Sequence, residues 1–173
     1  ISDIFSQGLL VIIAELLKLL LVLVFMFYTS FKLTIVTLIT IPFLLMATAW
    51  FKKNIKSAFQ DVRTQVSKLN AFVQERIVGV KIVQIFNKEA SEYKKFKKIN
   101  KKHMNANIRS IFYYAVFFPI VEILSALAIA LVIWSGSLSI VNNSGATIGE
   151  IVAFILYIYM MFRPIRQLAD RFN

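Results

Sequence analysis

Residues 33–50 read LTIVTLITIPFLLMATAW and run directly into residues 51–73, FKKNIKSAFQDVRTQVSKLNAFV. The first stretch carries no charge over 18 residues, which is long enough to cross the apolar part of a bilayer as a helix. Pro42 inside it predicts a kink, which a membrane helix tolerates.

In the second stretch apolar residues recur every three or four positions, the repeat of a helix with one packed face. The recurring positions are Phe51, Ile55, Phe59, Val62, Val66, Leu69 and Val73. Neither Gly nor Pro interrupts them. The two stretches together therefore predict a helix that crosses the membrane and continues into water, where its apolar stripe needs a partner helix.

Three further apolar stretches occupy residues 8–28, 111–134 and 148–162. A hydrophobic content of 58% and a mean hydropathy of +0.71 are too high for an ordinary soluble core. The fold class expected is an all-α membrane protein with four long transmembrane helices and helical extensions into the cytoplasm. A loop is expected at residues 135–146, and Thr147 with Glu150 forms a capping-box pattern ahead of the fourth span.

The charges are concentrated in one segment. Residues 51–109 hold 15 Lys and Arg against four Asp and Glu, a surplus of 11 that equals the net charge of the whole chain. In the short connections on the opposite side of the membrane, Lys32 is the one charged residue. Three arginines follow the fourth span, on the same side as the basic segment. Because basic residues stay on the cytoplasmic side of a membrane, the arm and both chain ends are expected there. We expect a multi-pass protein of a bacterial inner membrane or other plasma membrane.

The basic arm must reverse direction between its two membrane ends. Gly79 is its only Gly or Pro, so the turn is expected near that residue, at about residues 79–86. The returning helix has a lysine-rich surface around Tyr93, Phe96 and Ile99, the pattern of a helix packed on one side.

Catalytic chemistry is missing from the sequence. There is no Cys, and the single histidine, His103, lies within a basic surface pattern. No GxxxxGK[ST] phosphate loop, GxGxxG or HExxH motif occurs. We therefore expect no enzyme activity, no metal and no cofactor in this chain.

Three ionisable residues lie inside the predicted spans, where an unpaired charge is costly. Glu122 lies near mid-membrane, one turn after Pro119, and is the best candidate for lining a cavity. Glu15 and Lys18 are three residues apart, so they either neutralise each other or contact a transported molecule. Tyr157 belongs to an aromatic and methionine cluster that fits a translocation path, although lipid contact and packing are the more usual roles of such residues.

The first residue is Ile1, with no initiating Met and no signal peptide ahead of the first span, and the last is Asn173. We expect both ends to be cuts within a longer protein.

Several segments in order along the chain carry a resemblance. They are residues 29–34 (TSFKLT), Pro42, residues 69–89 (LNAFVQERIVGVKIVQIFNKE) and residues 164–168 (PIRQL). With the two long helices that extend a membrane hairpin, this chain resembles the transmembrane domain of ABC exporters, the class of multidrug pumps and lipid flippases. The resemblance covers nearly the whole chain and implies the third to sixth of six membrane helices.

The resemblance also implies what the turn does. Residues 79–86 look like a coupling helix, which in such exporters sits in a groove on the nucleotide-binding domain of a partner half. Residues implied in this contact are Arg76, Gly79, Val80, Lys81, Ile82, Val83, Gln84, Ile85 and Phe86. The nucleotide-binding domain, with its ATP and Mg²⁺, is absent from the sequence, and the implied partners are that domain, the bilayer, a homo- or heterodimeric second half, and an exported small molecule, lipid or peptide.

Two other functions remain open. A membrane-anchored sensor or scaffold would use the helical arm to bind a protein without transport. A basic module on a membrane anchor would instead bind nucleic acid. Nucleic-acid binding is not needed to explain the charge of the lysine-rich helix, because membrane spans flank that helix and basic residues collect on the cytoplasmic side. The sequence thus favours an exporter membrane domain, with no nucleic-acid partner.

Overall fold

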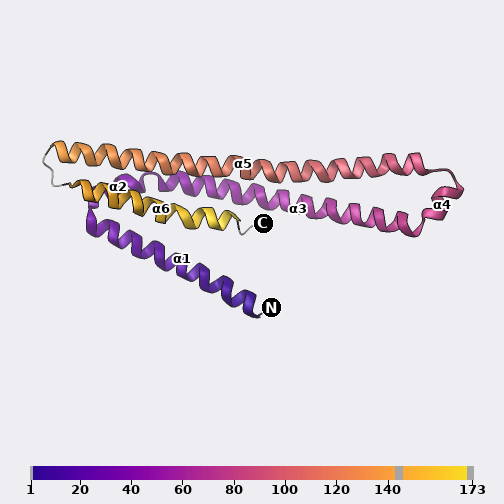
Figure 1. Cartoon of the computed structure of the whole chain (residues 1–173), viewed down its shortest axis with the longest axis horizontal. Helices are drawn as coiled ribbons and strands as arrows, with labels where there is room; N and C mark the ends of the chain where they lie inside the picture. Colours follow the sequence, from indigo (N-terminus) through magenta and orange to yellow (C-terminus); the bar gives the residue numbers. More distant parts are fainter. Residues whose placement is uncertain (1, 143–145, 171–173) are drawn as a thin grey trace. The chain divides into compact units, whose positions relative to one another are not determined.

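A computed structural model describes the backbone of residues 2–142 and 146–170, and the side chains of residues 10, 13–142 and 146–164. All elements of this described part are helices, as the fold class predicts (Figure 1). They are α1 (Ser2–Thr29), α2 (Phe31–Leu38), α3 (Ile41–Val78), α4 (Val80–Ile85), α5 (Glu89–Val141) and α6 (Ile148–Asp170). The chain divides into two compact units, unit 1 at residues 1–49 and 118–173, and unit 2 at residues 50–117.

A break between α2 and α3 lies two residues before Pro42. Proline has no amide hydrogen to donate to the preceding turn, so the helix is weakened there. The Thr40 hydroxyl donates to the Thr37 carbonyl at 2.8 Å, and the Leu44 amide donates to the Thr40 carbonyl at 3.1 Å. These bonds satisfy polar groups that lipid could not, and the helix is interrupted where the kink at Pro42 is expected.

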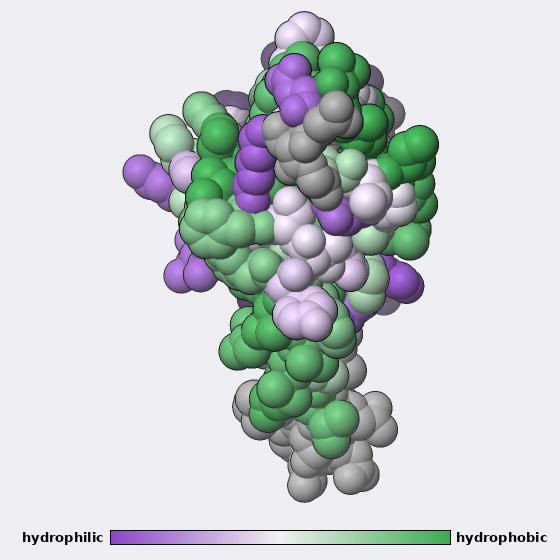
Figure 2. Space-filling view, turned by 90° about the vertical axis from the view of Figure 1, so that its left-hand side faces the viewer, coloured by the Kyte–Doolittle hydropathy of each residue, from purple (hydrophilic) through white to green (hydrophobic). Residues whose placement is uncertain are grey.

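In unit 1, α1 packs against α2 and α6. Buried side chains come from all of these helices and from the unit 1 part of α5, among them Met26, Leu33, Val132, Phe154 and Ile158. Many apolar side chains of unit 1 are nevertheless exposed. Figure 2 shows hydrophobic residues along the helix that projects downward, α1, where Leu16, Leu17, Leu20 and Leu21 are exposed. A helix that is apolar all round needs lipid or protein around it.

The structure extends one of the predicted elements and shows how another begins. The helix α5 continues to Val141, so the loop expected from residue 135 was placed too early. Ser139 explains part of this extension, because its hydroxyl donates to the Ser135 carbonyl at 2.9 Å and accepts from the Lys32 ammonium group at 2.8 Å. At the start of α6 the Glu150 amide donates to the Thr147 hydroxyl at 3.2 Å, which confirms the expected cap.

Among the described residues, two stretches are long and apolar enough to cross a membrane, Phe31–Val78 and Glu89–Val141. They contain the predicted second and third spans. The first and fourth spans fall within α1 and α6 and stay predictions.

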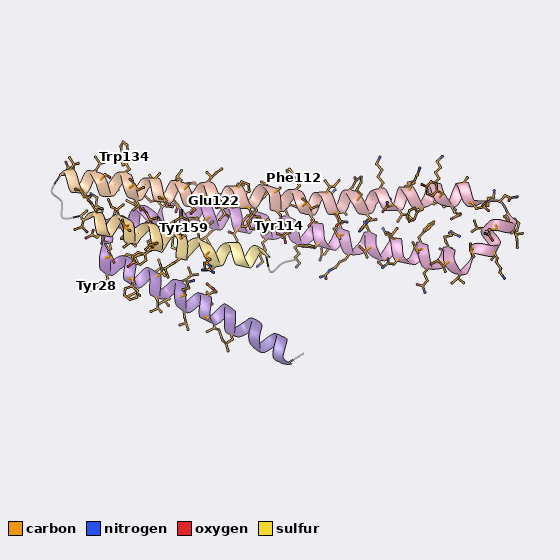
Figure 3. All side chains as sticks on the ribbon, in the orientation of Figure 1. Tyr28, Phe112, Tyr114, Glu122, Trp134 and Tyr159 are labelled. Carbon is orange, nitrogen blue, oxygen red and sulfur yellow. The ribbon has the colours of Figure 1, made fainter. Side chains whose placement is uncertain are left out.

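Unit 2 is a hairpin in which α3 and α5 lie antiparallel (Figure 1). Its core begins with Phe51, whose ring stacks on Phe117 at 4.2 Å between centroids and meets Tyr114 edge-on at 5.3 Å. Figure 3 shows Tyr114 on the side of α5 that faces α3, and Phe112 on the opposite side.

The helix repeat in this seam is shorter than predicted. Buried and half-buried positions of α3 continue along a heptad series: Phe51, Ile55, Ala58, Val62, Gln65, Leu69, Phe72 and Arg76. A spacing of seven residues per two turns is that of two helices that coil around each other. The predicted stripe shares Phe51, Ile55, Val62 and Leu69 with this series, and its Phe59 and Val66 are half-buried. Val73 is exposed because Phe72 and Arg76 take the packed positions.

A test of unit 1 packing uses Gly136 in α5. A β-carbon there would lie 2.6 Å from Ile151 Cγ1 and 2.8 Å from its Cδ1, so Gly136→Ala overpacks the contact between α5 and α6. We expect a loss of about 1–3 kcal/mol of stability, measured as a lower melting temperature of the complete protein in detergent.

The matched control is Gly149→Ala in α6, where the new β-carbon would meet only Thr147 Oγ1, at 3.8 Å. This change should be neutral or stabilising, because alanine favours a helix by up to about 1 kcal/mol over glycine. Adding Ile151→Ala to Gly136→Ala should restore part of the loss. Equal melting temperatures for the two glycine variants would contradict the close contact.

Candidate functional site

The turn between the two long helices of unit 2 is built around α4. Its first corner is Gly79, whose amide donates to the Glu75 carbonyl at 3.0 Å and whose carbonyl accepts from the Ile82 amide at 3.0 Å. Its second corner is Asn87, the one non-glycine residue with a positive φ, 48°, among those described. Asparagine tolerates this left-handed conformation better than most residues. The turn expected near Gly79 is therefore present. The second corner at Asn87 was not predicted, although an asparagine at this place could have indicated it.

The short helix presents apolar side chains to solvent. Ile82 is 63% exposed, Ile85 75% and Phe86 67%. Val80 and, just before the turn, Ile77 and Val78 are exposed as well. Ile77 and Val78 also line an open cavity of about 500 Å³ together with Leu69, Val73 and Phe96. Outside the membrane, such a cluster of exposed apolar groups is typical of a surface that binds another protein.

The polar residues expected around this cluster take two different positions. Lys81 and Gln84 are exposed beside it, and Val83 is half-buried. Arg76 instead points into the hairpin, where its Nε lies 2.7 Å from Glu92 Oε2 on α5 and its guanidinium lies over the Phe72 ring at 5.2 Å. The structure thus assigns Arg76 a contact within the hairpin that the sequence analysis did not foresee.

Glu92 links the two ends of the turn. Its Oε1 accepts from the Lys95 ammonium group at 2.7 Å, while its other oxygen meets Arg76. The hydrogen bond from Lys95 lowers the pKa of Glu92 below its usual value of 4.5, and the positive charges of Arg76 and Lys95 act in the same direction. The carboxylate is therefore ionised at neutral pH and holds α5 to the last turn of α3.

The four residues expected to line a cavity all lie in unit 1. Glu15 is half-buried on α1, and its Oε2 is enclosed without a hydrogen-bond partner among the described atoms. Lys18 is half-buried one turn later, and the two form no ion pair within the described part of the chain.

Glu122 lies on α5, and its side chain is exposed (Figure 3). Tyr157 on α6 is half-buried, and its ring meets Phe154 edge-on at 5.8 Å between centroids. A shallow apolar depression in unit 1 is lined by Trp134, Leu138 and Val141 with neighbouring residues, and none of the four candidates contributes to it. No group of three or more metal-ligating side chains occurs among the residues that the structure describes.

A helical chain with two membrane-length apolar stretches, extensive apolar surface on unit 1 and a basic hairpin is an integral membrane protein. More specifically, the chain belongs to the family of ABC transporter transmembrane regions, whose pattern matches residues 1–165.

Three bacterial proteins are among the relatives of this chain. The chain is 31% identical over its full length to the uncharacterized ABC transporter ATP-binding protein YknV of Bacillus subtilis, of which it covers 28%. Over 83% of its length it is 33% identical to the multidrug resistance-like ATP-binding protein MdlA of Buchnera aphidicola, covering 25% of that protein. It is 28% identical, again over 83% of its length, to the ATP-dependent lipid A-core flippase of Syntrophus aciditrophicus, covering 24%. The chain thus spans about a quarter of the length of these curated relatives.

The Glu92 contacts predict an acid-sensitive turn. Because the pKa of Glu92 is lower in the folded protein, its stabilising contribution is complete above pH 4.5 and is lost as the pH falls through the lowered pKa. In Glu92→Gln we expect the protection factors of the amides of residues 76–92, which correct the exchange rates for intrinsic chemistry, to be about two- to fivefold lower at neutral pH. They should fall less on acidification than in the wild type.

Glu75→Gln is the control, because its carboxylate is 67% exposed and lies 3.5 Å from Arg76. It should leave exchange in the turn close to that of the wild type. Hydrogen exchange followed by mass spectrometry measures both variants, and unchanged exchange in Glu92→Gln would show that the ion pair does not hold the turn.

Proposed function

We propose that this chain is the membrane-spanning part of an ATP-driven exporter, and that α4 is its coupling helix. The observation that carries the proposal is the exposed apolar surface of α4. In this reading Ile82, Ile85 and Phe86 insert into an apolar groove of the nucleotide-binding domain of a partner half, and Lys81 and Gln84 form hydrogen bonds at the rim. Burying large apolar side chains at the centre of a contact, with polar groups around it, is the usual anatomy of a protein interface.

The internal contacts of the hairpin suit such a role. Arg76 and Glu92 join α3 to α5 directly behind α4, at 2.7 Å. A force applied to α4 by a moving partner would then reach both long helices rather than unwind the turn. We therefore propose that Arg76 positions α4 for the coupling contact and does not itself contact the partner.

The proposed orientation rests on the charge distribution. The surplus of 11 positive charges in residues 51–109 favours a cytoplasmic position for this segment, and for α4 with it. ATP and Mg²⁺ would be bound by nucleotide-binding domains outside the present sequence, in a homo- or heterodimer. Their closure on ATP would move α4, and the spans would alternate between inward- and outward-open states.

The translocation path is proposed to include Glu122, Glu15, Lys18 and Tyr157. Carboxylates in a membrane-spanning helix suit a cationic or zwitterionic group on an otherwise apolar molecule. The lipid and drug transport named for the relatives is compatible with such a path. A membrane-anchored scaffold is the alternative function, because the same apolar surface of α4 could bind a protein without transport.

Phe86→Ala in the complete protein tests the coupling role. Removing a ring that is 67% exposed should not harm the fold, but it should lower transport about tenfold or more while ATP binding stays intact, since interface anchors often contribute 2 kcal/mol or more. Transport in proteoliposomes and binding of a fluorescent nucleotide are the two measurements.

Tyr93→Ala is the matched control, because Tyr93 is an aromatic residue of α5 with 59% exposure that lies outside α4. Its transport should equal that of the wild type. Full transport by Phe86→Ala, or an equal loss in both variants, would remove the coupling assignment and favour the scaffold.

Glu122→Gln tests the proposed path. Loss of the negative charge should weaken the stimulation of ATPase activity by cationic amphiphiles severalfold, because the free energy of about one charge–charge contact is lost. Basal ATPase activity should stay unchanged. A stimulation profile identical to that of the wild type for cationic and neutral compounds would return Glu122 to a structural role.

A further inference from the structure

One end of unit 2 carries an aromatic and basic surface that the coupling proposal does not use. We call it the Trp50 patch and define it by Trp50, Lys52, Lys53, Lys56 and Tyr113. The Trp50 ring meets the Tyr113 ring edge-on at 5.7 Å between centroids and an interplanar angle of 74°, so α3 and α5 both contribute. The Trp50 side chain remains 43% exposed, which leaves part of the indole open to a further contact.

The three lysines of the patch are exposed, and they form no ion pair among the described residues. They form a continuous strip beside Trp50 on α3, because Lys53 is three residues after Trp50, Lys56 is three after Lys53, and Lys52 is four before Lys56. Asp61, the next acidic residue along α3, is already paired with Arg109 Nη1 at 2.9 Å. The patch therefore has an uncompensated positive charge.

The patch lies where both helices change character. The uncharged stretch of residues 33–50 ends at Trp50, and the apolar stretch of residues 111–134 begins next to Tyr113. Such a boundary is at the level of the lipid headgroups, where Trp and Tyr are enriched because their rings are apolar at one side and polar at the other. Lysine side chains there extend their ammonium groups toward phosphates.

We propose that the Trp50 patch binds the headgroup of an anionic phospholipid. The ammonium groups of Lys52, Lys53 and Lys56 contact the lipid phosphate and the second anionic or hydroxyl-bearing group, and the exposed edge of Trp50 packs at the glycerol level. Each lysine near a membrane surface raises the affinity for anionic lipid about fivefold. Three lysines therefore predict a preference of at least about tenfold for an anionic over a zwitterionic lipid. This site requires neither the coupling contact nor the transport path.

The lysines of α5 farther along unit 2 provide a matched control. Lys94, Lys98 and Lys101 are also exposed and form no ion pair in the described part of the chain. They lie away from the ends of both apolar stretches in sequence. Replacing three lysines at either place removes the same charge, so a general attraction to anionic membranes would respond equally to both changes.

The experiment measures quenching of Trp50 fluorescence by brominated lipids in the complete protein. The Trp50 signal is the difference between the wild type and Trp50→Phe, in bilayers of phosphatidylcholine mixed with phosphatidylglycerol. At equal mole fractions, brominated phosphatidylglycerol should quench Trp50 more than brominated phosphatidylcholine, with a relative binding constant of about ten or more. The triple variant K52Q/K53Q/K56Q should bring this ratio close to one, and K94Q/K98Q/K101Q should leave it unchanged.

Other outcomes overturn the proposal. Equal quenching of the wild type by the two lipids would exclude a preference without requiring any variant to fold. Absence of quenching by either lipid would mean that protein covers Trp50, and an equal effect of both triple variants would mean that only the overall charge matters. Displacement of brominated phosphatidylglycerol by inorganic phosphate would assign the patch to a free anion instead of a lipid.

Discussion

The antiparallel packing of α3 on α5 within unit 2 is the interaction on which the candidate site depends. It begins with the stacked rings of Phe51 and Phe117 and ends with the ion pair of Arg76 and Glu92. Small side chains at Ala58 and Ala106, both buried, let the helix backbones approach between these ends. A helix as short as α4 would not be stable alone in water, because nucleation costs more than one turn of hydrogen bonds returns. The packed hairpin of α3 and α5 holds the two ends of α4 in place.

The exposed apolar side chains of α4 are intelligible only in this setting. An isolated chain would reduce their contact with water by folding them inward, but the bonds at Gly79 and Asn87 fix the backbone so that Ile82, Ile85 and Phe86 point outward. The cost of this exposure is recovered if a partner covers them. Arg76 and Glu92 behind α4 keep the surface rigid, which lowers the entropy lost on binding.

Much of the fold could be predicted because it follows from charge and hydropathy alone. An uncharged stretch followed by a basic amphipathic one admits few structures, so the course of α3 beyond residue 50 and the reversal near Gly79 were both correctly expected. The heptad spacing of the seam was not predicted. A stripe ending at Val73 and one ending at Phe72 and Arg76 differ by one residue, and choosing between them requires the partner helix. Asn87 and the Glu92 contacts escaped prediction for the same reason, since they depend on where two distant segments meet.

Net positive charge has two separate consequences in unit 2. Near the turn part of it is paired: Glu92 lies between Arg76 and Lys95 and joins two helices by ion pairs that stabilise a particular geometry. At the Trp50 end the lysines form no ion pair among the described residues, and Asp61, the next acidic residue along α3, is paired with Arg109. A charge surplus that served orientation alone could be spread evenly along the arm. Three lysines beside Trp50 and Tyr113, at the ends of two apolar stretches, fit a ligand that is anionic at one end and apolar at the other, which is the chemistry of an acidic phospholipid.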